Sequence, residues 1–424
     1  MDQPPCLPPA HMPGHMRNPA PAALPNPNPA PAAAAAAALF ASFSATVGEM
    51  RLDVIPSGPE RLDRMLALIA GARRSVRLLT YIFANDAAGA QVLAALCAAA
   101  ARGVRVAVLV DSFGSAATAD GFFMPLRAAG GQARWFGTRW TPQYLIRNHQ
   151  KLLVVDEDVV MAGGFNIAAP YFAAAGDPAG WQDIGITITG PRTADMVAWF
   201  DQLAAWMDAP RPRFRDLRRA VAGWVPAAGP VQWLIGGPTP RLSPWARALR
   251  ADIAAGRDMA LSTAYFSPNT GVMRRIGRMA RRGGNVSLVL PAHSDNAATI
   301  GASRLLYAYL LKRGAAVFEF EPARLHNKLI VIDSTVLIGS ANLDMRSLYV
   351  NMELMLRVED AAFADQCRAL IRAQQAVSTP ITPARHRQRA TWINRLRWAA
   401  AWLIVGMVDY SVTRRLNFGL AGRD

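Results

Sequence analysis

The chain has 424 residues, of which 52% are hydrophobic, so it can bury one large core or two medium ones. Its net charge of +16 favours an anionic partner such as nucleic acid, phospholipid headgroups or a phosphorylated substrate, although arginine accumulated through base composition would give the same total. The three scattered cysteines exclude a disulfide framework and indicate a reducing compartment, and the lack of a run of about 18 uncharged apolar residues excludes a spanning helix.

The N-terminal segment differs from the rest of the chain. Residues 1–48 are rich in proline and alanine and carry almost no charge, which predicts a disordered tail. An apolar stretch at residues 32–45 is only faintly similar to a signal peptide, because it lies behind a long Pro/Ala-rich run without a basic start.

Helices and strands then alternate. Residues 61–72 have helical spacing, residues 75–83 alternate as a strand does, residues 88–103 form a helix that ends at Gly103, and residues 104–111 form a buried strand. This alternation predicts an α/β fold with a mixed or mostly parallel sheet and helices on both faces.

The same order of elements recurs in the second half of the chain. Residues 231–240 repeat the pattern of 52–60, and the following strand and helix–strand segments repeat in the same order. A repeat of this length predicts a duplicated domain rather than a solenoid. We therefore expect two similar halves related by a pseudo-two-fold axis. The predicted units are a tail at 1–48, halves at 49–208 and 228–376, a linker at 209–227 and a basic, amphipathic tail at 377–424.

One short motif, His-x-Lys-x4-Asp followed by small residues and Asn, occurs once in each half. The two copies are His149, Lys151, Asp156 and Asn166, and His326, Lys328, Asp333, Ser340 and Asn342. Apolar runs follow each lysine and indicate strands, on which positions i and i+2 face the same side. His and Lys therefore project from the same side of the strand. The aspartate, at i+7, falls on the opposite side and beyond the strand, so it is expected to bind backbone amides of a turn or a neighbouring segment. It is kept among the candidate catalytic residues because it completes the motif.

Two such pairs facing each other suit phosphodiester chemistry. Lysine is a compact charge for non-bridging oxygens, and Lys151 and Lys328 are two of only three lysines in the chain. One imidazole can attack phosphorus while the other protonates the leaving alkoxide. The lysines with Asn166, Asn342 and Ser340 are candidates for binding the phosphate, and no metal or other cofactor is expected.

A nucleophilic histidine needs its other ring nitrogen to be oriented. Asp183 and Glu353 each stand at the start of an alternating strand beyond the asparagine of their half, so they are candidates for accepting that hydrogen bond. Ordinary salt bridges remain an alternative interpretation for both.

On these residues the sequence resembles the phospholipase D superfamily, and residues 263–268, 290–296 and 339–354 are similar to its cardiolipin synthase branch. The resemblance covers roughly 49–376. It implies the superfamily fold, a phosphatidyl-histidine intermediate and transfer of a phosphatidyl group between lipid alcohols. It also implies His149 as nucleophile and His326 as acid, whereas the local sequences are too alike to give that order. The chain is more similar to the short class that lacks two N-terminal spanning helices.

Two further segments bear on the partner. The tail from 385 to 424 combines arginine, tryptophan and a short apolar stretch, which predicts a helix lying on an anionic membrane or, alternatively, packed on the core. Residues 273–284 place Arg274, Arg278 and Arg281 at helical spacing, either facing the same membrane or forming a solvated face.

The leading hypothesis is a peripheral enzyme on the cytoplasmic face of the inner membrane that joins two phosphatidylglycerols into cardiolipin and glycerol, with phosphatidylethanolamine as a possible donor. Hydrolysis to phosphatidic acid by the same site is the first alternative. A superfamily nuclease is the second, although the basic runs lack interleaved aromatic residues and no nucleic-acid partner is expected. A catalytically dead membrane scaffold is the third. The sequence leaves the oligomeric state open.

Overall fold

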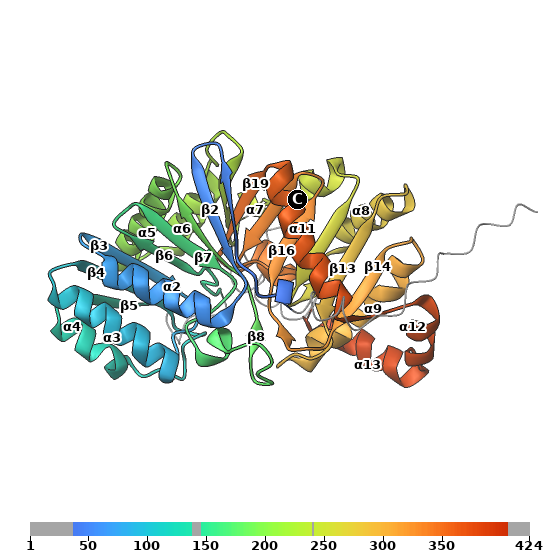
Figure 1. Cartoon of the computed structure of the whole chain (residues 1–424), viewed down its shortest axis with the longest axis horizontal. Coiled ribbons are helices and arrows are strands. Elements are labelled where there is room, and N and C mark those ends of the chain that lie inside the picture. The colour runs from blue at the N-terminus through green and yellow to red at the C-terminus, as the bar shows by residue number, and fades with distance from the viewer. Residues whose placement is uncertain (1–36, 138–145, 240, 406–424) are drawn as a thin grey trace, which may run out of the picture.

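The computed structural model describes residues 37–137, 146–239 and 241–405. Two lobes lie side by side, each built on an eight-stranded mixed sheet with helices on both faces (Figure 1). The predicted α/β fold with two similar halves is confirmed. The predicted N-terminal tail lies mostly outside the described residues.

The first sheet has the order β1-β2-β9-β7-β6-β3-β4-β5. Its strands are β1 (Phe43–Val47), β2 (Met50–Ile55), β3 (Ser75–Thr80), β4 (Arg105–Asp111), β5 (Gln132–Phe136), β6 (Leu152–Val155), β7 (Val159–Gly163) and β9 (Gly185–Thr189). The helices of this half are α2 (Gly58–Gly71), α3 (Ala87–Ala101), η1 (Asp120–Phe123), α4 (Met124–Ala128), η3 (Ala169–Phe172), α5 (Thr193–Asp208) and α6 (Phe214–Gly223).

The second sheet has the order β10-β19-β17-β16-β11-β13-β14-β20 and repeats the first in its central strands. Its strands are β10 (Val231–Gly236), β11 (Met259–Thr263), β13 (Val286–Pro291), β14 (Ala316–Phe320), β16 (Lys328–Ile332), β17 (Thr335–Gly339), β19 (Glu353–Glu359) and β20 (Ser378–Pro380). The helices are α7 (Pro244–Ala255), α8 (Thr270–Arg281), α9 (Ala297–Leu311), α10 (Met345–Tyr349), α11 (Ala361–Ala376), α12 (Pro383–Arg389) and α13 (Trp392–Leu403).

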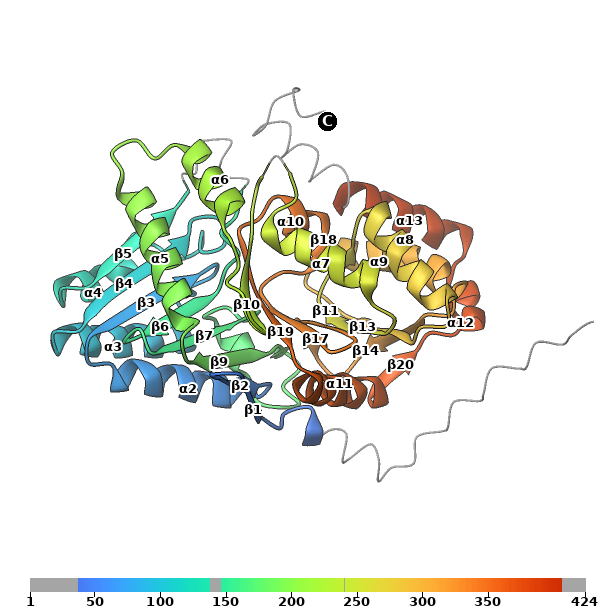
Figure 2. The same cartoon turned by 90° about the horizontal axis from the view of Figure 1, so that it is seen from above.

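The layers follow from the apolar pattern of the strands. Helices α2 and α3 cover one face of the first sheet, and α7, α8 and α9 cover one face of the second (Figure 2). The opposite faces, with α5 and α11, contribute to one hydrophobic cluster that joins both halves, including Leu152 and Val160 from the first sheet and Leu329 and Val336 from the second. A shared core of this kind fixes the two sheets relative to each other.

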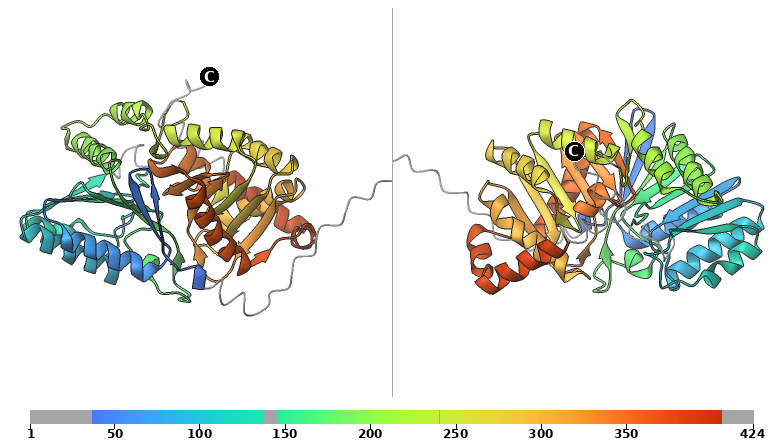
Figure 3. Two further views of the ribbon diagram at one scale, coloured as in Figure 1. Left: turned by 45° about the horizontal axis from the view of Figure 1, so that its top comes forward. Right: turned by 180° about the vertical axis from the view of Figure 1, so that it is seen from behind.

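Several segments differ from the sequence prediction. Strand β1 belongs to the first sheet although it lies within the predicted tail. The predicted linker forms α6, which buries Leu217 and Val221 in the shared core because its apolar residues recur every four positions. In the predicted C-terminal tail, β20 pairs with β14, and α13 packs along α9 at the outer side of the second half (Figure 3).

Candidate active site

The His-Lys motifs lie where two hairpins start. His149 and Lys151 lead directly into β6, while His326 stands two residues before Lys328, the first residue of β16. The hairpin β6–β7 turns through three residues and β16–β17 through two, which agrees with the spacing from motif aspartate to asparagine being one residue shorter in the second half. The extra residue sits in the turn, which leaves the small-residue segments after β7 and β17 equivalent.

The backbone before each motif pairs with the other half of the chain. Strand β15 (Arg324–Leu325) runs parallel to β8 (Trp181–Gln182), and the His326 amide donates to the Gln182 carbonyl at 2.7 Å. At the equivalent position of the other half, the His149 amide donates to the Met352 carbonyl at 2.9 Å. Each histidine is therefore held by the segment that leads into the carboxylate of the opposite half.

The carboxylates pair with the histidines across the two halves. His149 Nδ1 lies 3.1 Å from Glu353 Oε2, and His326 Nδ1 lies 2.6 Å from Asp183 Oδ2. An ionised carboxylate only accepts hydrogen bonds, so each Nδ1 carries the proton and each Nε2 is the unprotonated ring nitrogen; that of His326 lies 3.1 Å from Lys328 Nζ. The sequence indicated these two carboxylates as partners but gave no sign that the pairs would cross.

The lysines lie beside their own histidines. Lys151 Nζ donates to the His149 carbonyl at 2.7 Å. Lys328 Nζ lies 2.5 Å from the His326 carbonyl and 2.7 Å from its Nδ1, and the side chain is buried. Both ammonium groups therefore face the histidines, as the shared parity of i and i+2 predicts.

The small-residue segments differ between the halves. Ser340 Oγ donates to Glu353 Oε2 at 2.5 Å and accepts from the Leu354 amide at 3.0 Å. Gly164 holds the corresponding place in the first half, where a Cβ would lie 2.5 Å from Asp183 Oδ1 and 2.7 Å from Lys328 Cδ. Glycine is required there because the side chains of Asp183 and Lys328 occupy the space.

The two asparagines are buried beside this cluster. Asn166 Oδ1 accepts from the Ile82 amide at 3.2 Å, and the Asn166 side chain bonds to the Tyr171 phenol. Asn342 Oδ1 has no hydrogen-bond partner among the described residues. A buried polar atom without a partner is uncommon, which fits a group that meets a ligand.

Burial lowers the pKa of His149 and of His326 to about 4, and the nearby lysine charges act in the same direction against the carboxylates. Both imidazoles are therefore neutral at pH 7 without substrate. Burial also lowers the pKa of Lys151 to about 7 and that of Lys328 to about 8, despite the opposing carboxylates.

The carboxylates respond to these same charges. Burial alone would raise the pKa of Asp183, but the charge of Lys328 and the interaction with His326 outweigh it and lower the pKa. Burial likewise opposes ionisation of Glu353, and His149 and Lys151 lower its pKa overall. Both carboxyl groups thus stay ionised and acceptor-only beside the histidines.

Four side chains that the sequence analysis did not identify surround the two catalytic histidines and the Asp183 backbone. Tyr171 and Trp181 each lie edge-on to His326 with ring centroids 5.1 Å away, and Tyr81 lies 4.9 Å from His149. Arg61 of α2 is fully buried and donates to the carbonyl oxygens of Asp183 at 2.5 Å and Tyr171 at 2.7 Å. Only Tyr81 carried a signal, because it recurs as Tyr265 in the repeat.

The motif aspartates do not belong to this cluster. Asp156 accepts hydrogen bonds from the amides of Arg73, Arg74 and Ser75, and Asp333 accepts from those of Arg257 and Asp258. Each lies at the far end of its strand and ties the hairpin to the start of the neighbouring strand. Their inclusion among candidate catalytic residues is therefore corrected, and the backbone role expected from their parity agrees with these contacts.

Within residues 37–137, 146–239 and 241–405, no cluster of three or more His, Cys, Asp or Glu side chains is arranged to hold a metal ion. In the same ranges no helix is both long and apolar enough to cross a bilayer.

Two apposed halves that each bring one His-Lys pair to a shared centre define the phospholipase D-like class of phosphotransfer proteins. The chain matches the family model "Cardiolipin synthase, PLD-like domain" over residues 65–204 and 251–374. It is 30% identical over 340 residues to cardiolipin synthase A of Pseudomonas putida, covering 78% of this chain and 70% of that protein. It is 29% identical over 356 residues to cardiolipin synthase B of Escherichia coli, covering 81% and 85%.

A solved structure shares the fold. Phosphatidylserine synthase of Haemophilus influenzae superposes with a TM-score of 0.66 at 15% identity, covering 89% of this chain and all of that one. The chain belongs to the cardiolipin synthase family of phospholipase D-like proteins, as the resemblance implied, and it is a phosphatidyltransferase that acts on phospholipids.

Proposed function

We propose that the enzyme joins two phosphatidylglycerol molecules into cardiolipin and glycerol through a phosphatidyl group carried on His149. The observation that supports this most directly is the pair of crossed Nδ1–carboxylate contacts, His149–Glu353 and His326–Asp183. They leave both Nε2 atoms unprotonated in one cluster that also holds two lysines, of which Lys328 lies 3.1 Å from His326 Nε2.

In the first step, His149 Nε2 attacks the phosphorus of the donor lipid. A P–N bond forms, the P–O bond to glycerol breaks, and His326 gives its proton to the departing oxygen. His326 gains that proton when the substrate binds, because the phosphodiester anion offsets the lysine charges that lower its pKa in the free enzyme.

In the second step, the acceptor hydroxyl returns a proton to His326 and attacks phosphorus. The new P–O bond forms, the P–N bond breaks, and His149 is neutral again. Lys151, Lys328 and the amide groups of Asn166 and Asn342 stabilise the charge on the non-bridging oxygens in both steps. A second phospholipid acceptor gives cardiolipin, whereas water gives phosphatidic acid.

The choice of His149 as nucleophile has one asymmetry in its favour. The side chain of His149 is 12% exposed and that of His326 is 6% exposed, so His149 is the more accessible imidazole. Tyr171 and Trp181 enclose His326, which suits a group that moves a proton without forming a bond to phosphorus.

Product analysis and trapping test this function together. Purified enzyme with phosphatidylglycerol vesicles should yield cardiolipin and glycerol in equal amounts. Phosphatidic acid as the main product would make the enzyme a hydrolase. With a phosphatidyl ester of a good leaving group, which needs no acid, His326→Ala should accumulate a phosphatidyl adduct on the peptide that contains His149. An adduct on His326 in the reciprocal His149→Ala variant would reverse the two roles.

We also propose that the enzyme meets lipid at the cytoplasmic face of the inner membrane as a peripheral protein, through α13. Five of the seven large apolar side chains that the described residues leave exposed lie on α13 or directly after it: Trp392, Ile393, Leu396, Leu403 and Ile404. Residues 377–405 hold five arginines and no acidic residue. An apolar strip beside clustered arginines favours an anionic bilayer surface. Phosphatidylethanolamine remains a candidate donor in place of one phosphatidylglycerol.

A further inference from the structure

The arginine-rich run at residues 273–284 forms most of α8, and its charges divide between two faces. Arg275, Arg278 and Arg282 follow an i, i+3, i+7 spacing and project toward α7, while Arg274 and Arg281 lie outside this group. The sequence indicated Arg274, Arg278 and Arg281 as one face, and the structure corrects that set.

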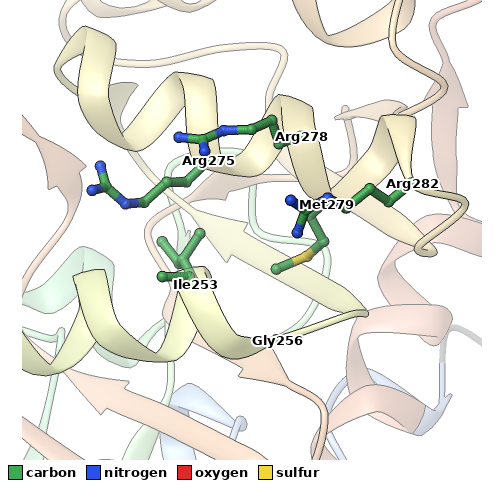
Figure 4. Close-up of a pocket in the computed structure, with 7 residues that line it drawn as sticks. Ile253, Gly256, Arg275, Arg278, Met279 and Arg282 are labelled. Atoms are coloured by element: carbon green, nitrogen blue, oxygen red, sulfur yellow. The ribbon is translucent and has the colours of Figure 1, made fainter.

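A cavity of about 180 Å³ lies between the end of α7 and α8. We call it the α7–α8 pocket. Figure 4 shows Arg275 and Arg278 of α8, and Arg282 directly after it, opposite Ile253 of α7 and Gly256, which directly follows α7. Ile253 and Met279 give the pocket an apolar side, and no acidic residue lines it.

Among the described residues, the three guanidinium groups have no acidic partner. Arg275 Nη1 donates only to the Gly271 carbonyl at 3.1 Å and Arg278 Nε to the Arg274 carbonyl at 3.4 Å, and none of the three forms an ion pair with a described residue. Asp252 is the nearest acid along α7, and both of its carboxylate oxygens already bind Arg357 at 3.0 Å. The positive charge of the pocket is therefore not neutralised within the described chain.

A second cavity shows the contrasting case. It has a volume of about 250 Å³ and lies over Arg77 and Arg105 in the first half. Arg77 there binds both oxygens of Asp201, at 2.8 and 2.9 Å, and also contacts Glu157. That cavity carries its own counter-charge, whereas the α7–α8 pocket does not.

Like charges at i, i+3 and i+4 on a helix repel each other, so three unpaired arginines on one face destabilise α8 slightly. An anion between them reverses that effect. Guanidinium groups present planar forks that match the oxygens of a phosphate, and the apolar side formed by Ile253 and Met279 suits the carbon part of an ester.

We propose that the α7–α8 pocket binds the phosphate of a phosphate ester at a place separate from the catalytic cluster. Helices α7, α8, α9 and α13 pack successively on the same side of the second sheet (Figure 2). A phospholipid headgroup reached from the α13 surface and a soluble phosphate ester share this chemistry. The pocket contains no residue of the catalytic cluster, so the proposal stands whether or not the proposed reaction does.

A matched pair of variants tests the proposal on the full-length enzyme. Arg275→Gln with Arg278→Gln removes two pocket charges, and Arg274→Gln with Arg281→Gln removes two charges from the same helix outside the pocket. Each protein is titrated with glycerol 3-phosphate and followed by its melting temperature. Each is also sedimented with vesicles of phosphatidylglycerol in phosphatidylcholine and with phosphatidylcholine alone. The catalytic cluster binds phosphate too, so the comparison is between the two variants.

We expect the pocket variant to bind at least one probe about tenfold more weakly than the control variant does. A difference seen only with phosphatidylglycerol vesicles identifies the ligand as a lipid headgroup. A difference that extends to glycerol 3-phosphate identifies the phosphate ester itself. Equal behaviour of the two variants with every probe would overturn the proposal, and a retained melting temperature without ligand verifies that both variants are folded.

Discussion

Lysine is rare in this chain, and the environment of Lys328 explains why arginine does not replace it there. Its ammonium group lies within 2.7 Å of the His326 carbonyl and Nδ1, and its stem passes over Gly164. A guanidinium is larger and planar, so Lys328→Arg should lower kcat by at least about 100-fold although the charge is kept. Steady-state transfer assays measure this.

The control for that substitution is the third lysine. Lys312 lies exposed at the end of α9, and Lys312→Arg should leave kcat within about twofold of the original enzyme. If Lys328→Arg turned over as fast as Lys312→Arg, the requirement for a compact ammonium would be wrong.

The buried titratable groups predict a bell-shaped pH profile for kcat/KM. With a substrate whose good leaving group needs no acid from His326, activity should rise as pH increases through about 4, because His149 is protonated and cannot attack below that pKa. Lys151 and Lys328 are charged below their lowered pKa values of about 7 and 8, so activity falls as pH rises through 7 to 8. A plateau that extends to pH 10, where ordinary lysines titrate, would contradict this assignment.

Gly164 and Ser340 occupy equivalent positions but cannot be exchanged. Gly164→Ser places a side chain into Asp183 and Lys328, so it should abolish measurable transfer. Ser340→Gly removes the hydrogen bond to Glu353 and the one accepted from the Leu354 amide but creates no close contact, and it should cost about tenfold in kcat. Circular dichroism and transfer assays on both variants test this order, and equal losses would show that the close contact at Gly164 is unimportant.

At the scale of elements, the spacing of apolar residues along the chain predicted the helices and strands whose formation depends on neighbouring residues. The apolar run after each motif lysine indicated the strands and the side shared by His and Lys. Strand β1 and helix α6 were missed because an almost uncharged, Ala-rich stretch and a Pro- and Arg-rich stretch are typical of tails and linkers. Both become ordered through contacts with distant parts of the shared core, which no local pattern reports.

For helix α13 the sequence left two alternatives, a helix packed on the core and a helix lying on a membrane surface, and the structure has features of both. Trp398 stacks on His386 at 5.6 Å, and a Cβ on Gly301 would lie 2.9 Å from Ala401 Cβ, so one side packs tightly on the domain. Trp392 and Leu396 are 76% and 66% exposed. The helix is therefore attached to the core and also leaves an apolar strip uncovered.

If that strip contacts lipid, Trp392→Ser with Leu396→Ser should weaken sedimentation with phosphatidylglycerol vesicles by at least about tenfold, since two large apolar side chains no longer leave water. Met124, 64% exposed in the first half, provides the control, and Met124→Ser should bind vesicles normally. Hydrolysis or transfer of a short-chain, water-soluble lipid should stay unchanged in both variants. Equal vesicle binding by all three proteins would rule out α13 as the contact.

At the scale of the whole molecule, the duplication predicted two His-Lys pairs that face each other. It could not predict which carboxylate accepts a hydrogen bond from which histidine. Within one half, Asp183 follows the motif of His149, and the nearest choice along the chain is the wrong one. The pairs cross because β8 lies beside β15 and the His149 segment lies beside Met352, an arrangement set by how the two sheets pack. The role of Arg61 could not be predicted from the sequence for the same reason, because the backbone carbonyls to which it donates are distant along the chain.

Crossed pairing predicts that each carboxylate variant reproduces the defect of the histidine in the other half. Glu353→Gln replaces the acceptor-only carboxylate beside His149 with an amide whose NH2 can donate to Nδ1 and leave the ring proton on Nε2. It should therefore slow formation of the phosphatidyl adduct even when the leaving group is good. Asp183→Asn affects His326, so it should slow transfer from phosphatidylglycerol by about 100-fold or more but form the adduct normally with the good leaving group. Burst kinetics with the two substrates separate these steps.

The opposite pattern, with Asp183→Asn blocking adduct formation and Glu353→Gln spared, would mean that the nucleophile is His326 while the crossing still holds. A pattern in which each carboxylate follows the histidine of its own half would contradict the crossing itself. Because Asp183 and Glu353 are both fully buried, loss of folding could imitate either result. Adduct formation excludes that explanation for the variant that shows it, because it requires an assembled interface between the halves, and an unchanged circular dichroism spectrum and melting temperature exclude it for the other.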